Sequence, residues 1–169
     1  MRQILLAGVS ITFTFMSMAS SAEDVSYTLV SPVPFAENSG ASSDVKGSCT
    51  LETRLPQFIE DAAKRGVKVV ISPDPGEDVA GKVLYLEFTH ILGTGGGAWS
   101  GPKSVTVRGE LKENGELIGS FTASRYSSGG AFGGFKGTCD ILGRCIKTLG
   151  KDIAGWLKKP TMNAMLGNA

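Results

Sequence analysis

The sequence has little of what most catalytic and metal-binding chemistry requires. One histidine and three cysteines stand among 169 residues, so catalytic triads and zinc-type ligand sets are poorly supplied. Seventeen basic residues face sixteen acidic ones, so the strong positive field typical of nucleic-acid binding is absent. We therefore expect no nucleic-acid partner, no metal and no cofactor.

Hydrophobic runs long enough to cross a bilayer are also lacking. The apolar segment Ile4–Met18 has 15 residues, fewer than the ~20 that a spanning helix needs. It follows Arg2 and precedes Ala19–Ala22, whose small side chains suit cleavage after Ala22. This order is typical of a secretory signal peptide, so residues 1–22 are predicted to be one and the mature protein to be periplasmic or secreted. No cysteine lies near the cleavage site to carry a lipid anchor.

The rest of the chain has a globular composition, with 41% hydrophobic and 20% charged residues overall. Apolar periodicity predicts a single domain over residues 23–160 and a loose tail over 161–169. Strands are predicted over 25–30, 67–71, 83–91, 103–112 and 116–126, and helices over 54–65 and 139–158. This order favours an α/β (α+β) fold: a mixed four- to five-stranded sheet with two amphipathic helices packed on it. The small, polar segment 36–48 is expected to be a loop.

The boundaries of the first helix depend on three residues. Thr53 is a suitable N-cap, Gly66 is a suitable stop, and Pro56 is tolerated if it lies in the first turn. The closing helix contains Gly143, Gly150 and Gly155, which either weaken it or permit close approach to the sheet.

The turn between the last two predicted strands follows from matching their apolar faces. A two-residue turn at Asn114-Gly115 places the apolar sets of the two strands on opposite faces. A three-residue loop over 113–115 pairs Leu111 with Leu117 and places both sets on one face. The three-residue loop is therefore predicted, with Gly115 in the left-handed conformation.

Element order and the runs VKVVISP and GKVLYLEFTHI, over about residues 65–158, resemble bacterial envelope domains. These are the amino-terminal domain of TolB and the periplasmic domain of the curli-transport lipoprotein. The chain departs from them because it has no lipid-carrying cysteine and because 73–82 is too short for their second helix. The resemblance implies a binding and assembly module rather than an enzyme.

Glycine is abundant, with 23 residues, and two glycine-rich segments span 93–101 and 129–137. Neither matches the phosphate-binding motifs of P-loop or Rossmann proteins. The predicted strand directions place both segments at one end of the sheet, with Trp99, Phe132 and Phe135 near one another. These rings either form a partner-binding or membrane-binding patch or fold back over the core.

Three cysteines in an exported chain allow one disulfide and one free thiol. A Cys139–Cys145 bridge is predicted, which requires Cys139 to precede the closing helix. Cys49 pairing with either of the others is the alternative. A zinc site that adds His90 to the cysteines matches no common spacing.

The remaining polar candidates have ordinary structural explanations. His90 is predicted to share one face of its strand with Leu84, Leu86 and Phe88 and to lie next to the first glycine-rich segment. Glu87 and Glu110 are candidate sheet neighbours but form no readable catalytic pair. A group of lysines makes one side of the closing helix basic and is expected to face solvent: Lys147, Lys151, Lys158 and Lys159.

These observations favour a non-catalytic binding or accessory module of the bacterial cell envelope. Its partner would be an envelope protein, a membrane surface or further copies of the chain. The alternatives are an inhibitor of an exported enzyme, which would insert the loop over 93–101, and a small hydrolase that uses His90.

Overall fold

The structure is a computed structural model that describes residues 25–64, 66–73, 81–93, 102–128 and 136–168. The predicted signal peptide lies outside these residues. The elements in chain order are β1 (Ser26–Val30), α1 (Ser43–Ser48), α2 (Leu51–Ala63), β2 (Lys68–Ser72), β3 (Lys82–Leu92), β4 (Lys103–Glu113), β5 (Glu116–Ser127), α3 (Thr138–Trp156) and β6 (Ala164–Gly167).

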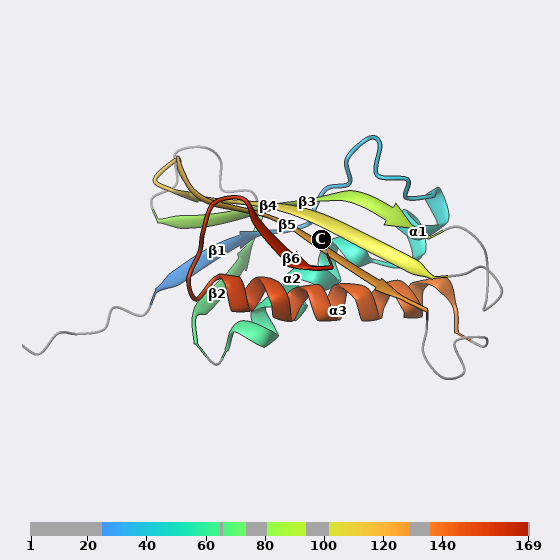
Figure 1. Cartoon of the computed structure of the whole chain (residues 1–169). Coiled ribbons are helices and arrows are strands. Elements are labelled where there is room, and N and C mark those ends of the chain that lie inside the picture. The colour runs from blue at the N-terminus through green and yellow to red at the C-terminus, as the bar shows by residue number, and fades with distance from the viewer. Residues whose placement is uncertain (1–24, 65, 74–80, 94–101, 129–135, 169) are drawn as a thin grey trace, which may run out of the picture.

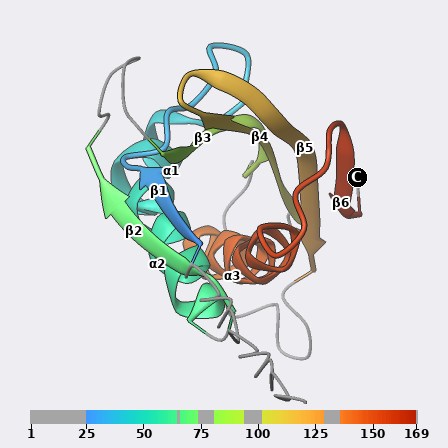
Figure 2. The ribbon, with the colours of Figure 1, turned by 90° about the vertical axis from the view of Figure 1, so that its left-hand side faces the viewer.

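The strands form one mixed sheet in the order β2-β1-β3-β4-β5-β6. Strand β1 runs parallel to β2 and β3, the meander β3-β4-β5 is antiparallel, and β6 runs parallel to β5. Helices α2 and α3 lie side by side on one face, and the sheet curves around them (Figures 1 and 2). The predicted class, a mixed sheet with helices packed on it, is confirmed. The described residues form six strands and three helices, however, so the predicted counts were too low.

The core lies between the two long helices and the inner face of the sheet. Helix α2 contributes a stripe at intervals of four residues, Leu51, Leu55 and Ile59, all of them fully buried. Such spacing places side chains on one face of a helix, which explains why apolar periodicity located it. The central strands supply the other half of the core with Leu84, Leu86, Phe88, Val105, Val107, Leu111, Phe121 and Ala123.

Helix α2 begins three residues earlier than predicted, so Thr53 is not its N-cap. The N-cap is Thr50, which has a left-handed backbone and makes no side-chain capping bond. Pro56 therefore lies in the second turn, where its missing N–H leaves the Glu52 carbonyl without a helical donor. The Val33 N–H donates to that carbonyl at 3.0 Å, so the segment after β1 replaces the bond that proline removes.

The segment 36–48, expected to be a loop, contains helix α1. Its N-cap is Ser42, whose hydroxyl accepts a hydrogen bond from the Val45 N–H at 3.3 Å. Val45 is its one buried residue, so the helix carries too little apolar periodicity to be visible in the sequence.

The β4–β5 turn differs from the predicted three-residue loop. Glu113 pairs with Glu116, so Asn114 and Gly115 form a two-residue turn, and both have positive φ. A bulge then skips Ile118, so Leu111 pairs with Gly119 rather than Leu117. The predicted sharing of one apolar face by the two strands is correct, because the extra residue of the bulge restores it.

The predicted position of His90 is wrong because of a second bulge. The β3–β4 register shifts between Phe88 and His90, so strict alternation fails at this point. Ile91 takes the buried position instead, and His90 is exposed.

Two glycines of α3, Gly143 and Gly150, permit close approach to α2 rather than to the sheet. A Cβ on Gly150 would lie 2.8 Å from Phe58 Cβ, and one on Gly143 would lie 2.9 Å from the Arg54 guanidinium. A Cβ on Gly155 would meet nothing within 4 Å. All four lysines predicted on the polar side of this helix and just beyond it are exposed: Lys147, Lys151, Lys158 and Lys159.

The expected loose tail over 161–169 instead contains β6. Ala164 pairs with Phe121 and Gly167 pairs with Ser124, which adds a sixth strand beyond β5. Its four residues are too few to show alternation in the sequence. The segment is ordered by its pairing with β5, which the sequence alone does not reveal.

Candidate functional site at the glycine-loop end

The strand ends that adjoin both glycine-rich segments lie at one end of the sheet. Leu92, at the end of β3, pairs with Ser104, and Lys103, at the start of β4, pairs with Ser127 near the end of β5. This agrees with the predicted strand directions. We call this end, defined by Leu92, Lys103, Ser127 and Cys139, the glycine-loop end. Trp99, Phe132 and Phe135 lie outside the described residues.

A disulfide anchors the glycine-loop end. Cys49, between α1 and α2, is bonded to Cys139 in the first turn of α3, across 90 residues of sequence. The predicted Cys139–Cys145 bridge is wrong, because both residues lie in α3 and Cys145 turns into the core. The structure therefore has one of the two alternative pairings. A disulfide agrees with an exported chain, since such bonds persist in oxidising compartments.

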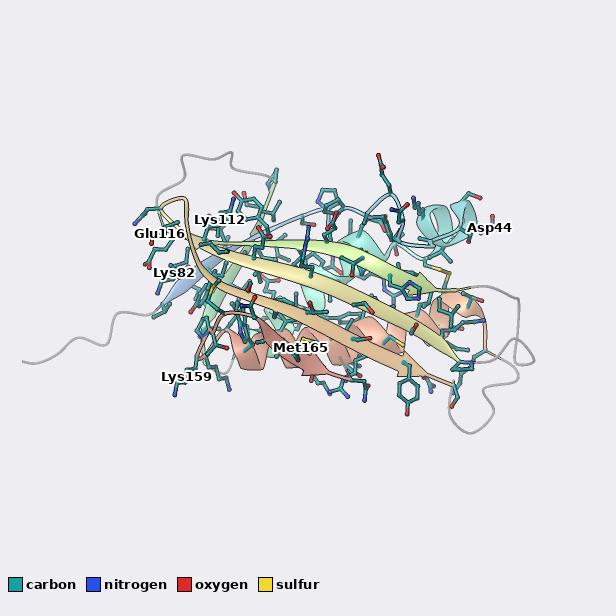
Figure 3. All side chains as sticks on the ribbon, turned by 45° about the horizontal axis from the view of Figure 1, so that its top comes forward. Asp44, Lys82, Lys112, Glu116, Lys159 and Met165 are labelled. Atoms are coloured by element: carbon teal, nitrogen blue, oxygen red, sulfur yellow. A yellow bond between two sulfur atoms is a disulfide. The ribbon has the colours of Figure 1, made fainter. Side chains whose placement is uncertain are left out.

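Helix α1, the end of β3 and the start of α3 pack together at the glycine-loop end. A Cβ on Gly93 would lie 3.0 Å from Val45 Cγ2 in α1 and 3.7 Å from Thr138 Cγ2 in α3. Asp44, in the first turn of α1, lies at the end of the molecule opposite the β4–β5 turn, where Lys82, Lys112 and Glu116 lie (Figure 3). Gly93, at the end of β3, thus lies in a closely packed junction with α1 and α3.

One row of side chains at this end exposes apolar surface. Leu92, Ser104 and Tyr126 are register partners across β3, β4 and β5 on the face of the sheet opposite the helices. Leu92 is 40% exposed and Tyr126 is 66% exposed. Neither residue was among the predicted contact residues. The alternation along β5, which buries Phe121 and Ala123, could have assigned Tyr126 to the outer face.

A surface hollow of about 490 Å³ lies beside Tyr126. Its lining residues are Arg125, Tyr126, Ser127, Ser128, Arg144, Cys145, Thr148 and Asn168. Arg125 makes a bidentate ion pair with Asp152, with N–O distances of 2.8 and 2.9 Å. This hydrogen bonding raises the pKa of Arg125, so its charge is retained but neutralised by Asp152.

Cys145 has none of the features of a catalytic thiol. It is 2% exposed, and its Sγ lies 3.7 Å from the Lys103 carbonyl oxygen. Burial raises its pKa to about 11, and a weaker backbone hydrogen bond opposes this shift. Because the thiolate is the nucleophile, a thiol with so high a pKa is unreactive near neutral pH.

We expect Cys145 in the folded protein to resist a thiol reagent such as DTNB at pH 8. With a pKa of about 11, roughly one thiol in a thousand is ionised at that pH, and the side chain is also buried. After unfolding in guanidinium, one thiol per chain should react, because Cys49 and Cys139 are bonded. A Cys145→Ala variant should show no reaction in either state. Rapid labelling of the native protein would contradict the assignment of an inert thiol.

Glu87 and Glu110 lie on the neighbouring strands β3 and β4, two register positions apart. Glu87 forms an ion pair with Arg108 at 2.9 Å, whereas Glu110 pairs in register with Tyr85. These two carboxylates are therefore not cross-strand partners. Within the described residues, no group of three or more His, Cys, Asp and Glu side chains could hold a metal ion. In the same part of the chain, no helix is both long and apolar enough to cross a membrane.

No protein-family model and no curated protein matches the sequence. Among solved structures, a variant of PelC from Paraburkholderia phytofirmans, a dodecamer, shares 18% identity with this chain. The match covers 76% of this chain and 86% of PelC, with a TM-score of 0.44. A DUF330 protein from Xanthomonas campestris shares 12% identity over 79% of this chain and 85% of its own, with a TM-score of 0.49.

A minor lipoprotein from Acinetobacter baumannii is a third match, with 16% identity over 80% of this chain and 93% of its own. Its TM-score is 0.41. All three proteins are bacterial, and none of them is a TolB domain or a curli-transport lipoprotein. Their TM-scores lie below 0.5, so these likenesses carry no argument about the function of this chain.

Proposed function

We propose that this chain is an exported, non-catalytic binding module that contacts a cell-envelope partner through its glycine-loop end. The row of Leu92, Ser104 and Tyr126 carries this proposal, because it exposes a large apolar side chain and an aromatic side chain where both glycine-rich segments begin. Tyrosine is enriched in protein interfaces, since it offers a broad contact area with a polar tip. Trp99, Phe132 and Phe135 are the proposed contact residues on the adjoining segments.

Two further observations support the proposal. The Cys49–Cys139 bridge joins the connection between α1 and α2 to the first turn of α3 at this end, and a rigid base lowers the entropy cost of binding. Two of the candidate reactive groups have structural surroundings: Cys145 is buried, and Glu87 is paired with Arg108. The proposed compartment is the periplasm or the exterior, where a structural disulfide is stable.

The triple variant Trp99→Ala/Phe132→Ala/Phe135→Ala tests this function. Wild-type protein in envelope fractions of its native host should cross-link to one envelope protein or sediment with membrane, and the triple variant should lose that association. Its melting temperature should change by no more than about 2 °C, as expected of surface substitutions.

A matched control removes exposed apolar side chains from the other end of the sheet. Val70 is 44% exposed and Leu117 is 42% exposed, and the register places both far from Leu92. Val70→Ala/Leu117→Ala should keep the wild-type association. Wild-type protein without any partner, or a triple variant that keeps its cross-links, would overturn the proposal. A large fall in melting temperature would show that the three rings belong to the core. A 1:1 complex with an exported enzyme would indicate an inhibitor.

A further inference from the structure

Helix α3 carries a row of exposed lysines. Successive residues of a helix turn by about 100° and rise by about 1.5 Å, so Lys147, Lys151 and Lys158 project within about 40° of one another along about 16 Å. The helical path reaches Lys158 because the Leu157 N–H still donates to the Ile153 carbonyl at 2.9 Å. All three lysines are exposed, and we call them the basic row. The sheet curves around the two long helices, so the outer side of α3 is turned away from it (Figure 2).

The charges of the basic row are unpaired. Within the described residues, its side chains make no ion pair and no hydrogen bond. The acidic residues of α3 do not compensate for it. Asp140 lies in the first turn, before the row begins, and Asp152 is held by Arg125 at 2.8 and 2.9 Å. The acidic residues of its own helix therefore leave the row positively charged.

The neighbouring elements do not neutralise the basic row either. On α2, Asp61 holds Lys64 at 2.6 Å, and Glu60 lines a hollow beside β2. On the sheet, Glu87 is paired with Arg108. The chain as a whole carries 17 basic and 16 acidic residues, so the row reflects a local separation of charge rather than a general excess.

The chemistry of the basic row indicates an extended anionic surface rather than a shaped pocket. Lysine is a point charge on a flexible stem, whereas the planar arginine fork recognises single carboxylates or phosphates. None of the large hydrophobic side chains exposed in the described residues lies on α3, so the row offers charge without apolar surface. Gly155 lies between Lys151 and Lys158, and a Cβ on it would meet nothing within 4 Å, so packing does not require a glycine there. Its missing side chain lets the row approach a flat surface closely.

We propose that the basic row binds the surface of a membrane that contains anionic phospholipids, without inserting into it. Headgroup phosphates form a continuous negative layer that a line of lysines can follow, and each lysine near it strengthens binding about fivefold. Helix α3 begins beside Cys139 at the glycine-loop end, and Trp156, its last residue, packs against Gly119 near the β4–β5 turn. The bound helix therefore lies along the membrane and leaves the glycine-loop end free for a protein partner. The proposal uses a different surface from the proposed function and does not depend on it.

Cosedimentation with lipid vesicles tests this contact. In about 50 mM NaCl, the mature chain should sediment with phosphatidylcholine vesicles that contain about 30% phosphatidylglycerol. It should stay in solution with vesicles of phosphatidylcholine alone. Raising the salt to about 1 M NaCl should release it from the anionic vesicles, because the screening length then falls to about 3 Å.

Variants that remove or keep charge locate the contact. Lys147→Gln/Lys151→Gln should bind anionic vesicles at least tenfold more weakly, because two lysines of the row are lost. Lys147→Arg/Lys151→Arg should bind as wild type does, since a fluid headgroup layer requires charge rather than lysine itself. The matched control, Lys46→Gln/Lys112→Gln, makes the same change in net charge on α1 and β4 and should also bind as wild type does. The exposed positions of Lys147 and Lys151 should leave the melting temperature unchanged.

Three results would overturn the proposal. The first is a wild-type protein that stays in solution with anionic vesicles at low salt. The second is equal binding to neutral vesicles, which would indicate apolar insertion instead. The third is a loss of binding in Lys46→Gln/Lys112→Gln as large as that in Lys147→Gln/Lys151→Gln, which would show that net charge alone decides the affinity.

Salt separates this contact from the one proposed for the glycine-loop end. Screening does not weaken an apolar contact, so envelope fractions washed with about 1 M NaCl keep only the association that the triple variant tests. Trp99→Ala/Phe132→Ala/Phe135→Ala should bind anionic vesicles as wild type does, and Lys147→Gln/Lys151→Gln should keep the cross-links to an envelope protein. Failure of one proposal can therefore be distinguished from failure of the other.

Discussion

A Cys49→Ala/Cys139→Ala variant is expected to lose about 4–5 kcal/mol of unfolding free energy, the largest effect predicted for this chain. The bridge spans 90 residues of sequence, and cross-linking so long a segment strongly restricts the unfolded chain. A domain of this size is typically stable by about 5–15 kcal/mol, so the loss is a large fraction of the total. Urea unfolding monitored by circular dichroism measures it.

Two comparisons isolate the bridge from the loss of the cysteine side chains. Cys145→Ala removes a buried sulfur without affecting the bridge and should cost much less than the double variant. Wild-type protein in excess reductant should unfold at nearly the same urea concentration as the double variant. If the oxidised protein and the double variant differ by less than about 1 kcal/mol, the bridge does not stabilise the fold through the unfolded state.

The second large effect is expected at the contact between the two long helices. Gly150→Ala should destabilise the protein by about 1–3 kcal/mol, because overpacking forces packed elements apart. The new Cβ would lie 2.8 Å from Phe58 Cβ and 2.9 Å from the Phe58 carbonyl carbon, and a backbone atom cannot move without its helix. The melting temperature should fall accordingly in a calorimetric scan.

The same substitution elsewhere in α3 provides matched controls. Gly155→Ala meets nothing within 4 Å and should stabilise the protein by about 0.5–1 kcal/mol through helix propensity. Gly143→Ala places its Cβ nearest the far end of the long Arg54 side chain, which can shift more easily than backbone, and should be nearly neutral. An equal gain at positions 150 and 155 would show that the helices are not in close contact at Phe58.

The sequence was most informative where burial repeats regularly. Leu51, Leu55 and Ile59 recur at helical spacing, and the inward residues of β3 and β4 alternate, so these elements could be predicted. The start of α2 could not be predicted, because its N-cap, Thr50, has a left-handed backbone and makes no side-chain capping bond. Pro56 was misleading for a tertiary reason, since the bond it lacks is replaced by Val33.

Bulges account for the errors in register. Matching the apolar faces predicted correctly which residues of β4 and β5 share the core. However, turns of different length can place the same residues on that face. A two-residue turn with a bulge at Ile118 satisfies the pattern as well as a longer loop does. The bulge before His90 likewise moves one polar residue outward without any local sequence signal.

The candidate site was predictable in position but not in composition. Strand directions alone placed both glycine-rich segments at one end of the sheet, and the register agrees. Cysteine pairing depended on how α1, α2 and α3 pack, which is tertiary information. Alternation along β3 and β5 could have assigned Leu92 and Tyr126 to the outer face of the sheet. The glycine-rich surroundings of Trp99, Phe132 and Phe135 made those three residues more conspicuous.

The burial of Cys145 also bears on how the chain reaches its correct oxidation state. The unfolded chain can form three different cysteine pairs, and two of them consume Cys145. Once α3 packs, the Cys145 thiol is enclosed and can neither attack the Cys49–Cys139 bond nor be attacked by another thiolate. Packing of the core thus favours the correct disulfide over the two wrong ones. We expect chains with a wrong pair to leave their core incomplete and their disulfide open to exchange, whereas burial of Cys145 ends exchange in correctly paired chains.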